Sequence, residues 1–584
     1  MAGVQLTGIG VSPGIAIGEA VLLGRREVQV SRRTVAEAEV PLEQGRFQEA
    51  VVRVRLQVEG IRTRAAEALG PRAASIFDSH LALLADDQFP AEVQERITAV
   101  RVNAEAALED VARRYADALA RLEDEVLQGR RTDVDDVAER LLRTLLGAEL
   151  PRLDALSPGT VLVTHSLAPS EAAQLDRQRV QGFVTQVGGR TSHTAILARS
   201  LELPAVVGLP GILGQVQERD QLILDGLTGS VLVNPDRAVV ADYQSRKEAY
   251  EQFTRQLHVL GALPAETADG YRVAVTANIE FPGEVAAARR HGAEGVGLYR
   301  TEFLYVNRTT PPTEEEHVAA YRTVAEAMAP NPVVIRTLDL GGAVAPAAAG
   351  ESDLRGAGRL RPIRLWLRRP ELFRTQLRAI LRASVHGNLK VMFPLISGVA
   401  ELREARGHLE AVQRELEAAG LPFNPHLEVG VMIETPAAAV IADLLAQEAD
   451  FLSLGTNDLI QYTLAIERDN EQVASLYEPL HPAILRLVRN TIAAAHTAGI
   501  WVAMCGEVAG DPLYTAVLVA LGIDELSMTP AAIPLIKRII RTLSMREAVQ
   551  VVHQLGSCTT AREVEGLLRR EMAGRLPELF GASA

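Results

Sequence analysis

The chain has 584 residues, 47% of them apolar and 23% charged, so it is long enough for several domains and too apolar to be disordered. Its formal net charge of −14 argues against a general nucleic-acid-binding protein, and an anionic ligand would have to be held by local arginine clusters. The two cysteines, Cys505 and Cys558, and the lack of a signal-peptide pattern or an apolar run of ~20 residues predict a cytoplasmic protein without membrane insertion.

The first part of the chain predicts an α/β domain that is interrupted by helices. Residues 4–23 predict a strand, a turn at Ser12-Pro13-Gly14 and a second strand. From about Thr34 to Glu149 the chain is rich in Ala, Glu, Arg and Leu, and it predicts an antiparallel bundle or two helical hairpins. One helix of this region carries an apolar stripe at Val51, Val54, Val58, Ile61 and Ala65. Strands are expected again at 160–164, 182–187, 222–224 and 231–233, so the simplest topology inserts the helices into the α/β domain.

The segment 188–208, GGRTSHTAILARSLELPAVVG, carries the most distinctive chemistry of this domain. Its two glycines allow a tight turn, and Arg190, Thr191 and Ser192 then lead His193 into the first turn of a short helix. A helix start offers free N–H groups and a partial positive charge, which suit an anion. His193 is therefore a candidate phosphoryl acceptor, the alternative being a structural cap or a core histidine.

The second half predicts a different architecture after a charged connecting helix at 236–260. Eight strands alternate with helical stretches, at 273–277, 295–299, 333–337, 390–393, 428–433, 451–454, 501–504 and 525–527. This order indicates a (β/α)8 barrel, with a doubly wound open sheet as the alternative.

Functional side chains cluster where these strands end, and in a barrel these ends share one rim. The residues at or just after the strand ends are Arg300, Glu302, Arg336, Asp339, Glu434, Asn457, Asp458, Arg468 and Cys505. Arginine forks suit phosphate and carboxylate groups, and two carboxylates suit Mg2+, which keeps water and substrate ligands. Cys505 is placed to act as an acid, the alternative being a buried structural cysteine.

Several strings resemble enzyme I of the bacterial phosphoenolpyruvate:sugar phosphotransferase system, a PEP-utilising enzyme family to which pyruvate phosphate dikinase and phosphoenolpyruvate (PEP) synthase are related. Besides 188–208, these strings are GLYRTEFLY, VIRTLDLGG, MIETPAA, SLGTNDLIQYTLAIERDN and MCGEVAGD. The resemblance implies a swivelling phosphohistidine α/β domain (1–33 and 147–235) with an inserted helical subdomain that binds the phosphocarrier HPr (34–146). The resemblance further implies a linker helix (236–260), which is the expected hinge. It also implies a PEP-binding TIM barrel (261–584) that forms a homodimer.

The resemblance also implies a phosphotransferase that moves the phosphoryl group of PEP to its own histidine, releases pyruvate and passes the group to HPr in sugar uptake. It assigns His193 as phosphoryl acceptor and Cys505 as proton donor. Substrate-binding residues would be Arg300, Arg336, Asn457, Asp458 and Arg468, and Mg2+ ligands would be Glu434 and Asp458. In the segment 76–87, IFDSHLALLADD, the residues His80, Asp86 and Asp87 would face HPr, the alternative being an ordinary solvated helix face.

The sequence departs from the family pattern in one segment. Ala343-Val344 replaces the usual Asp-Lys pair, Arg359 stands where a glycine is expected, and Arg361 matches a further substrate-side arginine. This departure keeps open a regulator that binds partners without turnover. A PEP synthase or pyruvate phosphate dikinase-like enzyme is a second alternative. Both need an ATP-binding domain ahead of the histidine, and only about 190 residues precede His193, so such an enzyme would have to lack that domain.

Overall fold

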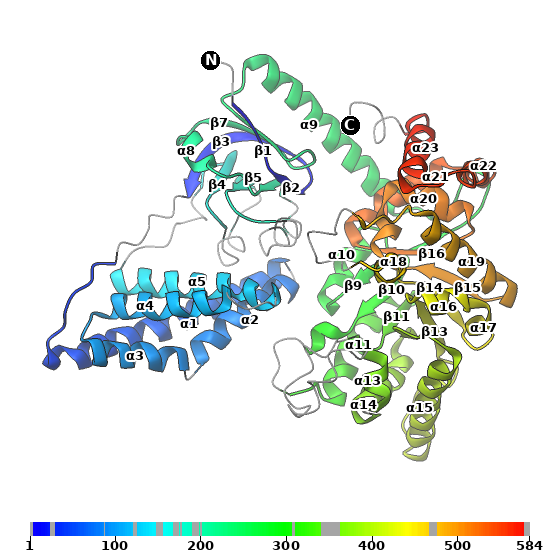
Figure 1. Cartoon of the computed structure of the whole chain (residues 1–584), viewed down its shortest axis with the longest axis horizontal. Coiled ribbons are helices and arrows are strands. Elements are labelled where there is room, and N and C mark those ends of the chain that lie inside the picture. Colours follow the sequence, from blue (N-terminus) through cyan, green and yellow to red (C-terminus); the bar gives the residue numbers. More distant parts are fainter. Residues whose placement is uncertain are drawn as a thin grey trace. The chain divides into compact units, whose positions relative to one another are not determined.

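A computed structural model of the chain divides into two compact units, Met1–Phe253 and Thr254–Ala584 (Figure 1). The structure describes residues 4–23, 30–69, 71–86, 88–120, 125–147, 156–167, 175, 178–189, 195, 198, 201, 203–305, 310–339, 362–368, 370–466 and 476–576. No helix among these residues is long and apolar enough to cross a lipid bilayer.

The helical part of the first unit contains the predicted bundle. Its helices are α1 (Val40–Leu69), α2 (Pro71–Ala85), α3 (Gln88–Val100), α4 (Ala104–Ala120) and α5 (Glu125–Leu146). The apolar stripe of α1 lies in the bundle core, where Val54, Val58 and Ile61 are buried. The apolar period of the sequence therefore identified the inward face of this helix.

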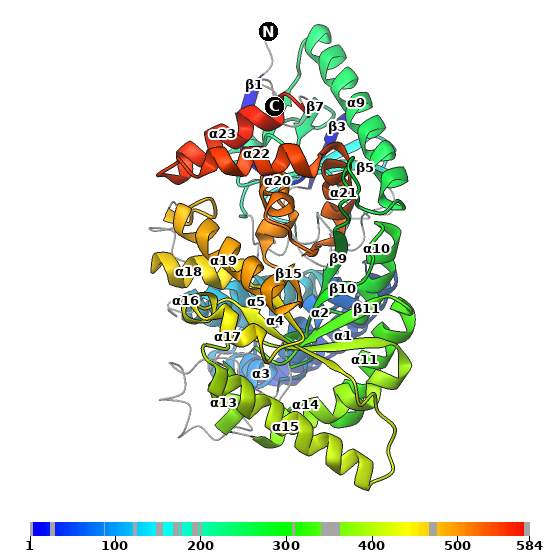
Figure 2. The same ribbon diagram turned by 90° about the vertical axis from the view of Figure 1, so that its right-hand side faces the viewer.

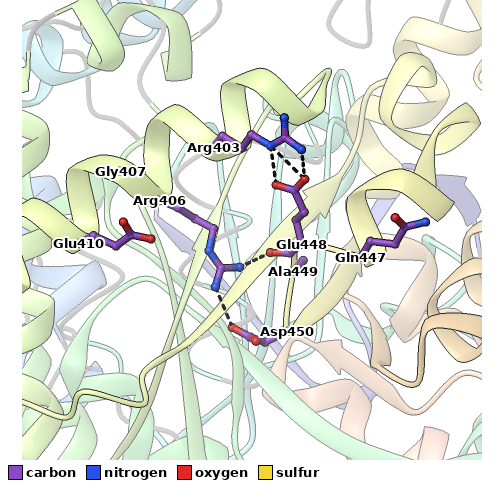
Figure 3. A pocket seen from close by; sticks show the side chains of 8 residues that line it. All are labelled: Arg403, Arg406, Gly407, Glu410, Gln447, Glu448, Ala449 and Asp450. Carbon is purple, nitrogen blue, oxygen red and sulfur yellow. Dashed lines mark hydrogen bonds and ion pairs between the residues drawn. The ribbon is translucent and has the colours of Figure 1, made fainter.

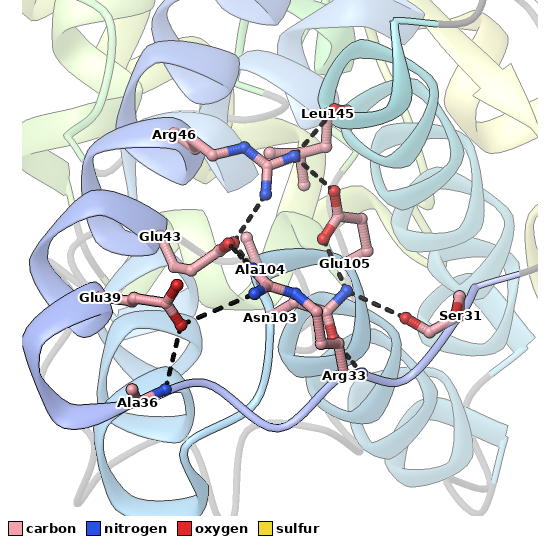
Figure 4. A network of polar contacts seen from close by, with 10 residues as sticks. All are labelled: Ser31, Arg33, Ala36, Glu39, Glu43, Arg46, Asn103, Ala104, Glu105 and Leu145. Carbon is pink, nitrogen blue, oxygen red and sulfur yellow. Dashed lines mark hydrogen bonds and ion pairs between the residues drawn. The ribbon is translucent and has the colours of Figure 1, made fainter.

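A polar network ties the beginning of the bundle to its end (Figure 4). Glu43 on α1 is 1% exposed, and its carboxylate accepts hydrogen bonds from Arg33 and Arg46, both at 2.7 Å, and from the Ala104 backbone N–H at 3.1 Å. Arg46 also donates to Glu105 at 2.6 Å and to the Leu145 carbonyl at 3.1 Å. The segment that enters α1, the start of α4 and the end of α5 are thus fastened together by one buried carboxylate and its partners.

The α/β part of the first unit is an eight-stranded sheet with the order β1-β8-β7-β3-β4-β5-β6-β2. The strands are β1 (Val4–Thr7), β2 (Ile9–Ser12), β3 (Ile15–Leu23), β4 (Thr160–Thr164), β5 (Val180–Thr185), β6 (Ala205–Val207), β7 (Gln221–Asp225) and β8 (Ser230–Val233). Alternate residues of β4 point into two different apolar cores. Leu162 lies in one core, and Val161 and Val163 lie in the other, so both faces of the sheet are covered. The short helix α8 (Ile212–Gln215) and the long connecting helix α9 (Arg237–Gly261) complete the elements before the barrel.

The first 23 residues form three strands where the sequence predicted two. Residues 4–7 pair with β8 and residues 9–12 pair with β6, so the first predicted strand is divided between two sheet neighbours. Gly8 lies between them, and a Cβ built there would come 2.2 Å from the Leu209 side chain. Strand β6 itself was not predicted.

The second unit is a closed barrel of eight parallel strands, which confirms the (β/α)8 prediction and excludes the open sheet (Figure 2). The strands are β9 (Ala274–Ile279), β10 (Val296–Arg300), β11 (Pro332–Arg336), β12 (Asn388–Phe393), β13 (Glu428–Ile433), β14 (Phe451–Leu454), β15 (Trp501–Met504) and β16 (Glu525–Met528). Strand β16 pairs with β9 and closes the ring.

Helices surround this barrel and bury its outer face in one large apolar core. They are α10 (Val285–Arg290), α11 (Glu314–Met328), α13 (Pro362–Arg368), α14 (Pro370–Ala383), α15 (Val399–Ala418), α16 (Pro436–Val440), α17 (Ala442–Ala446), α18 (Thr456–Leu464), α19 (Pro482–Ala498), α20 (Pro512–Ala520), α21 (Ile533–Thr542), α22 (Met545–Leu555) and α23 (Ala561–Ala573). Local signals fix several helix starts, such as the capping box in which Thr313 and Glu316 bond reciprocally at the start of α11.

Candidate active site

The described rim residues predicted from the sequence lie together at the carboxyl end of the barrel. Arg300 and Arg336 end β10 and β11, and Glu434 and Cys505 directly follow β13 and β15. Because all eight strands are parallel, these positions share one rim. Electrostatic interactions join Glu434 to Arg336, Asp339 and Asp458, and Cys505 to Arg300, Arg336 and Glu434, so the charged groups face a common region.

Of the two described rim arginines, Arg336 is the more strongly held. Its guanidinium lies 3.0 Å from Glu302 and 2.9 Å from Asp339, and its side chain is 12% exposed. Burial alone would lower the pKa of Arg336, but the charges of Glu302 and Asp339 raise it above the ordinary value. Arg336 is therefore a permanent positive charge in a nearly dry position, which suits recognition of an anion.

Buried hydrogen bonds hold the strand end that carries Arg336. The Gln376 side chain on α14 accepts from the Leu338 N–H at 2.9 Å and donates to the Thr301 hydroxyl at 2.9 Å. That hydroxyl in turn donates to the Arg336 carbonyl at 2.9 Å. The backbone from the Arg336 carbonyl to Leu338 is thus fixed by Gln376 of a surrounding helix and by Thr301, which follows the neighbouring strand.

The rim also concentrates negative charge. Glu434 is 1% exposed, and its carboxylate accepts from the Leu395 N–H at 2.6 Å. Burial, together with the nearby charges of Asp339 and Asp458, raises the pKa of Glu434 well above its ordinary value. Gly455 lets the chain pass close to this carboxylate, because a Cβ there would lie 2.9 Å from Glu434 Oε2.

Cys505 is 2% exposed, and its Sγ accepts a hydrogen bond from Ser453 Oγ at 3.3 Å. Burial raises the pKa of the Cys505 thiol to about 11, against the opposing effect of the Ser453 hydrogen bond. The group is therefore a protonated thiol at neutral pH. Asn278 donates to the Cys505 carbonyl at 3.0 Å and fixes the backbone at this position.

The remaining described rim residues are more accessible. Arg300 lies 3.1 Å from Glu280, and its side chain is 32% exposed. Asn457 accepts from the Glu507 N–H at 3.0 Å and so connects the chain after β14 to the chain after β15. Asp458 lies in the first turn of α18.

Of the residues with an expected role, His193, Arg468 and Asp87 lie outside the described residues, as do 190–192, 343–360 and Arg361. In the helical part, Asp86 is exposed and its side chain accepts from the Gln88 N–H at 2.9 Å. His80, in contrast, was expected to face a partner and is fully buried instead. Its two ring nitrogens lie 3.3 Å from Asp133 and 3.6 Å from Asp136, so its ring is directed into the bundle.

The sequence assigned no role to three residues that support the rim, Glu280, Ser453 and Gln376. Glu280 directly follows β9, so the same strand-end argument that selected the other residues would have found it. Ser453 lies within a strand whose four residues are all buried, and Gln376 lies on a surrounding helix. Neither position carries a sequence signal that links it to the rim.

A cavity of about 400 Å3 lies elsewhere on the barrel, between α15 and the chain that leads from α17 into β14 (Figure 3). It is lined by Arg403, Arg406, Gly407, Glu410, Gln447, Glu448, Ala449 and Asp450. Arg403 binds the Glu448 carboxylate, and Arg406 bonds the Glu448 carbonyl. Since Asp450 precedes β14, this cavity lies at the amino end of the strand, away from the rim.

Comparisons with known proteins match three successive parts of the chain to one enzyme family. Three family models match, namely the N-terminal part of PEP-utilising enzymes at residues 7–130, their mobile domain at 156–229 and their PEP-binding domain at 254–545. A phosphoenolpyruvate-protein phosphotransferase of Geobacillus stearothermophilus is 44% identical over 96% of this chain and 97% of the relative.

A protein of the same name from Bacillus subtilis (strain 168) is 42% identical over 97% of this chain and 99% of the relative. A solution structure of an Enzyme I protein (nEIt) is 41% identical, with a TM-score of 0.38, over 42% of this chain and 99% of that one. The sequence identity to full-length relatives decides the matter: the chain belongs to the phosphoenolpyruvate-protein phosphotransferases, within the PEP-utilising enzyme family.

Proposed function

We propose that this chain transfers the phosphoryl group of PEP to His193, releases pyruvate, and then passes the group to the phosphocarrier HPr. The observation that carries the proposal is the set of oppositely charged groups and one protonated thiol at a single barrel rim. A covalent phosphohistidine divides the transfer into two steps, so the kinetics are ping-pong.

The arginines bind the two anionic groups of PEP. Arg336 supports this role because its buried Nε has no hydrogen-bond partner among the described residues. An oxygen of the phosphate or the carboxylate would satisfy that N–H, and Arg300 and Arg468 would share the remaining charge. Asn457 contributes an uncharged donor from the start of α18.

Mg2+ fits the carboxylates of this rim. Burial raises the pKa values of Glu434 and Asp339, and neighbouring carboxylates add to this, Asp339 and Asp458 for Glu434 and Glu302 and Asp458 for Asp339. A divalent cation would relieve this excess of negative charge. Within the described residues no group of three His, Cys, Asp or Glu side chains forms a complete metal site. Two carboxylates, Glu434 and Asp458, are nevertheless enough for Mg2+, which keeps water and substrate oxygens as further ligands. When bound, the ion offsets charge on the transferring phosphoryl group and on the leaving enolate.

Cys505 protonates the enolate that remains after the phosphoryl group has left. The proton moves from Sγ to the methylene carbon and gives the methyl group of pyruvate. The raised pKa of this thiol keeps the proton in place until an enolate, which is a stronger base than water, is formed.

Further parts of the proposal concern assembly and location. We place the protein in the cytoplasm, as its cysteine content suggests. We also propose a homodimer through the barrel. This is supported by the exposed apolar side chains Val440 on α16, 71% exposed, and Leu444 on α17, 46% exposed. Sedimentation of the full chain tests this, since a monomer at all accessible concentrations would contradict it.

The two-step transfer is tested by discharge of the phosphorylated protein. Full-length protein is phosphorylated with radiolabelled PEP and Mg2+, freed of PEP and mixed with HPr. Label is expected to leave this chain and appear on HPr. Retention of the label on this chain would favour the regulator that binds partners without turnover. Protein carrying His193→Ala is the control, which should neither accept nor pass on label.

A further inference from the structure

The side chain that donates a hydrogen bond to the reacting sulfur, Ser453, has no assigned role. Ser453 is 1% exposed and lies in β14, next to β15, the strand after which Cys505 follows. Its hydroxyl donates to Cys505 Sγ at 3.3 Å, while the nearest acceptor for the thiol itself, the Leu454 carbonyl, is 3.8 Å away. The sulfur also belongs to an apolar cluster inside the barrel that includes Met392 and Met432. The charges of Glu434, Arg336 and Arg300 act on it as well, but burial has the largest effect and disfavours the anion.

This environment makes a sulfur anion costly. A buried charge without a hydrogen bond is strongly destabilised, and a donor aimed at it is worth more than a donor to a neutral group. The neutral thiol gains little from the Ser453 hydroxyl, because sulfur in a thiol is a weak acceptor. The hydroxyl therefore acts mainly on the charged form, which exists only after the proton has been given away.

We propose that Ser453 is a positioning residue for proton transfer, which orients Cys505 Sγ and stabilises the thiolate formed in the reaction. In this step the S–H bond breaks and its electron pair stays on sulfur. The electron pair of the enolate double bond forms the new C–H bond, and the enolate oxygen becomes the ketone oxygen of pyruvate. Solvent water returns a proton to the thiolate before the next cycle. The inference rests on the proposed role of Cys505 as proton donor.

The test compares pyruvate formation from PEP by full-length variants in the presence of HPr and Mg2+. Ser453→Ala should lower kcat by about 10- to 100-fold, the usual effect of losing a hydrogen bond to a charged group. The KM for PEP should change less than about twofold, because the Ser453 hydroxyl bonds to Cys505 and not to the groups that bind PEP. Ser384→Ala is the matched control. Ser384 is a buried serine whose hydroxyl donates to the Leu381 carbonyl and accepts from the Asn424 N–H, and the variant should keep the wild-type kcat.

A pair of variants of nearly equal size separates the effect of the hydroxyl from an effect on folding. Ser453→Thr and Ser453→Val have nearly the same shape and suit a strand, but only threonine keeps the hydroxyl. The threonine variant should turn over at least about tenfold faster than the valine variant, by the same hydrogen-bond estimate. Equal kcat values for the two, or a wild-type kcat for Ser453→Ala, would overturn the proposal.

A double-mutant cycle separates this inference from the function on which it rests. In a Cys505→Ala background, Ser453→Ala should change kcat by less than about twofold, because the group on which it acts is gone. The same loss in both backgrounds would show that Ser453 acts elsewhere and would overturn the inference alone. An unchanged kcat for Cys505→Ala by itself would instead remove the proposed proton donor, and the inference with it.

Discussion

Glu525 provides a quantitative test of the barrel interior. This residue begins β16, is 7% exposed, and accepts a hydrogen bond from Thr276 Oγ1 at 2.9 Å. Burial raises the pKa of its carboxyl to about 7, although the Thr276 hydrogen bond and the charge of Lys390 oppose the shift. Gly297 makes room for it, because a Cβ at that position would lie 2.3 Å from Glu525 Oε1. The substitution Glu525→Gln keeps the shape and removes the titration.

The sign and size of the effect follow from the pKa shift. The ordinary value is 4.5, so between pH 4.5 and about 7 the folded protein holds a proton that the unfolded chain releases. The free energy of unfolding of the wild type therefore falls as the pH rises through this interval, by about 1.4 kcal/mol per pH unit. The total is about 3 kcal/mol, of which about 2 to 3 kcal/mol is lost between about pH 5 and about pH 8. The glutamine variant lacks this loss.

The assay is urea unfolding of both proteins at the two pH values, followed by tryptophan fluorescence. The chain has two tryptophans, Trp366 and Trp501, and both lie in the barrel unit, so the signal reports that unit. The free energy of unfolding of Glu525→Gln, measured relative to the wild type, should increase by about 2 to 3 kcal/mol between pH 5 and pH 8. Glu404→Gln, a change at an exposed helix position, should show no such gain. A difference between Glu525→Gln and the wild type that does not vary with pH would refute the raised pKa.

Three further changes test other parts of the molecule. Glu43→Ala should destabilise the helical bundle by about 1 to 3 kcal/mol, because the buried Ala104 N–H and two partly exposed arginines lose their acceptor. Thermal unfolding followed by circular dichroism measures this effect. An unchanged melting temperature would contradict it. Gln376→Leu should cost about 1 to 3 kcal/mol of barrel stability by leaving the Leu338 N–H unpaired. It should also raise the KM for PEP by displacing Arg336, and steady-state kinetics with a wild-type KM would speak against that positioning. Chelation of divalent cations should stop pyruvate formation and added Mg2+ should restore it, whereas full activity in excess chelator would exclude the metal role of the rim carboxylates.

The barrel could be predicted from the sequence because its strands are continuous apolar runs between turns, as buried parallel strands are. The predicted bounds of β13, β14 and β15 agree with those found, Glu428–Ile433, Phe451–Leu454 and Trp501–Met504. Strand β6, in contrast, has three residues and is defined by its pairing with β2 and β5. Such a short segment owes its structure to distant neighbours, which a local pattern does not contain.

The same difference separates the site residues that were predicted from those that were missed. Arg300, Arg336, Glu434 and Cys505 were found because each ends or directly follows a strand, and the fold then determines the rim that they share. Ser453 was missed because every residue of its strand is buried, so the sequence does not tell which side chains point inward. The buried position of His80 was missed for a related reason, since its carboxylate partners lie on α5, more than fifty residues away along the chain.

The most direct measurement of the central claim is the location of the phosphoryl group after incubation of the full chain with radiolabelled PEP and Mg2+. The label is expected at His193 alone, with none in His193→Ala. In Arg336→Ala labelling should be strongly reduced, because the rim then lacks its buried cation. A label at another residue, a labelled His193→Ala protein, or wild-type labelling of Arg336→Ala would contradict transfer from this rim to that histidine.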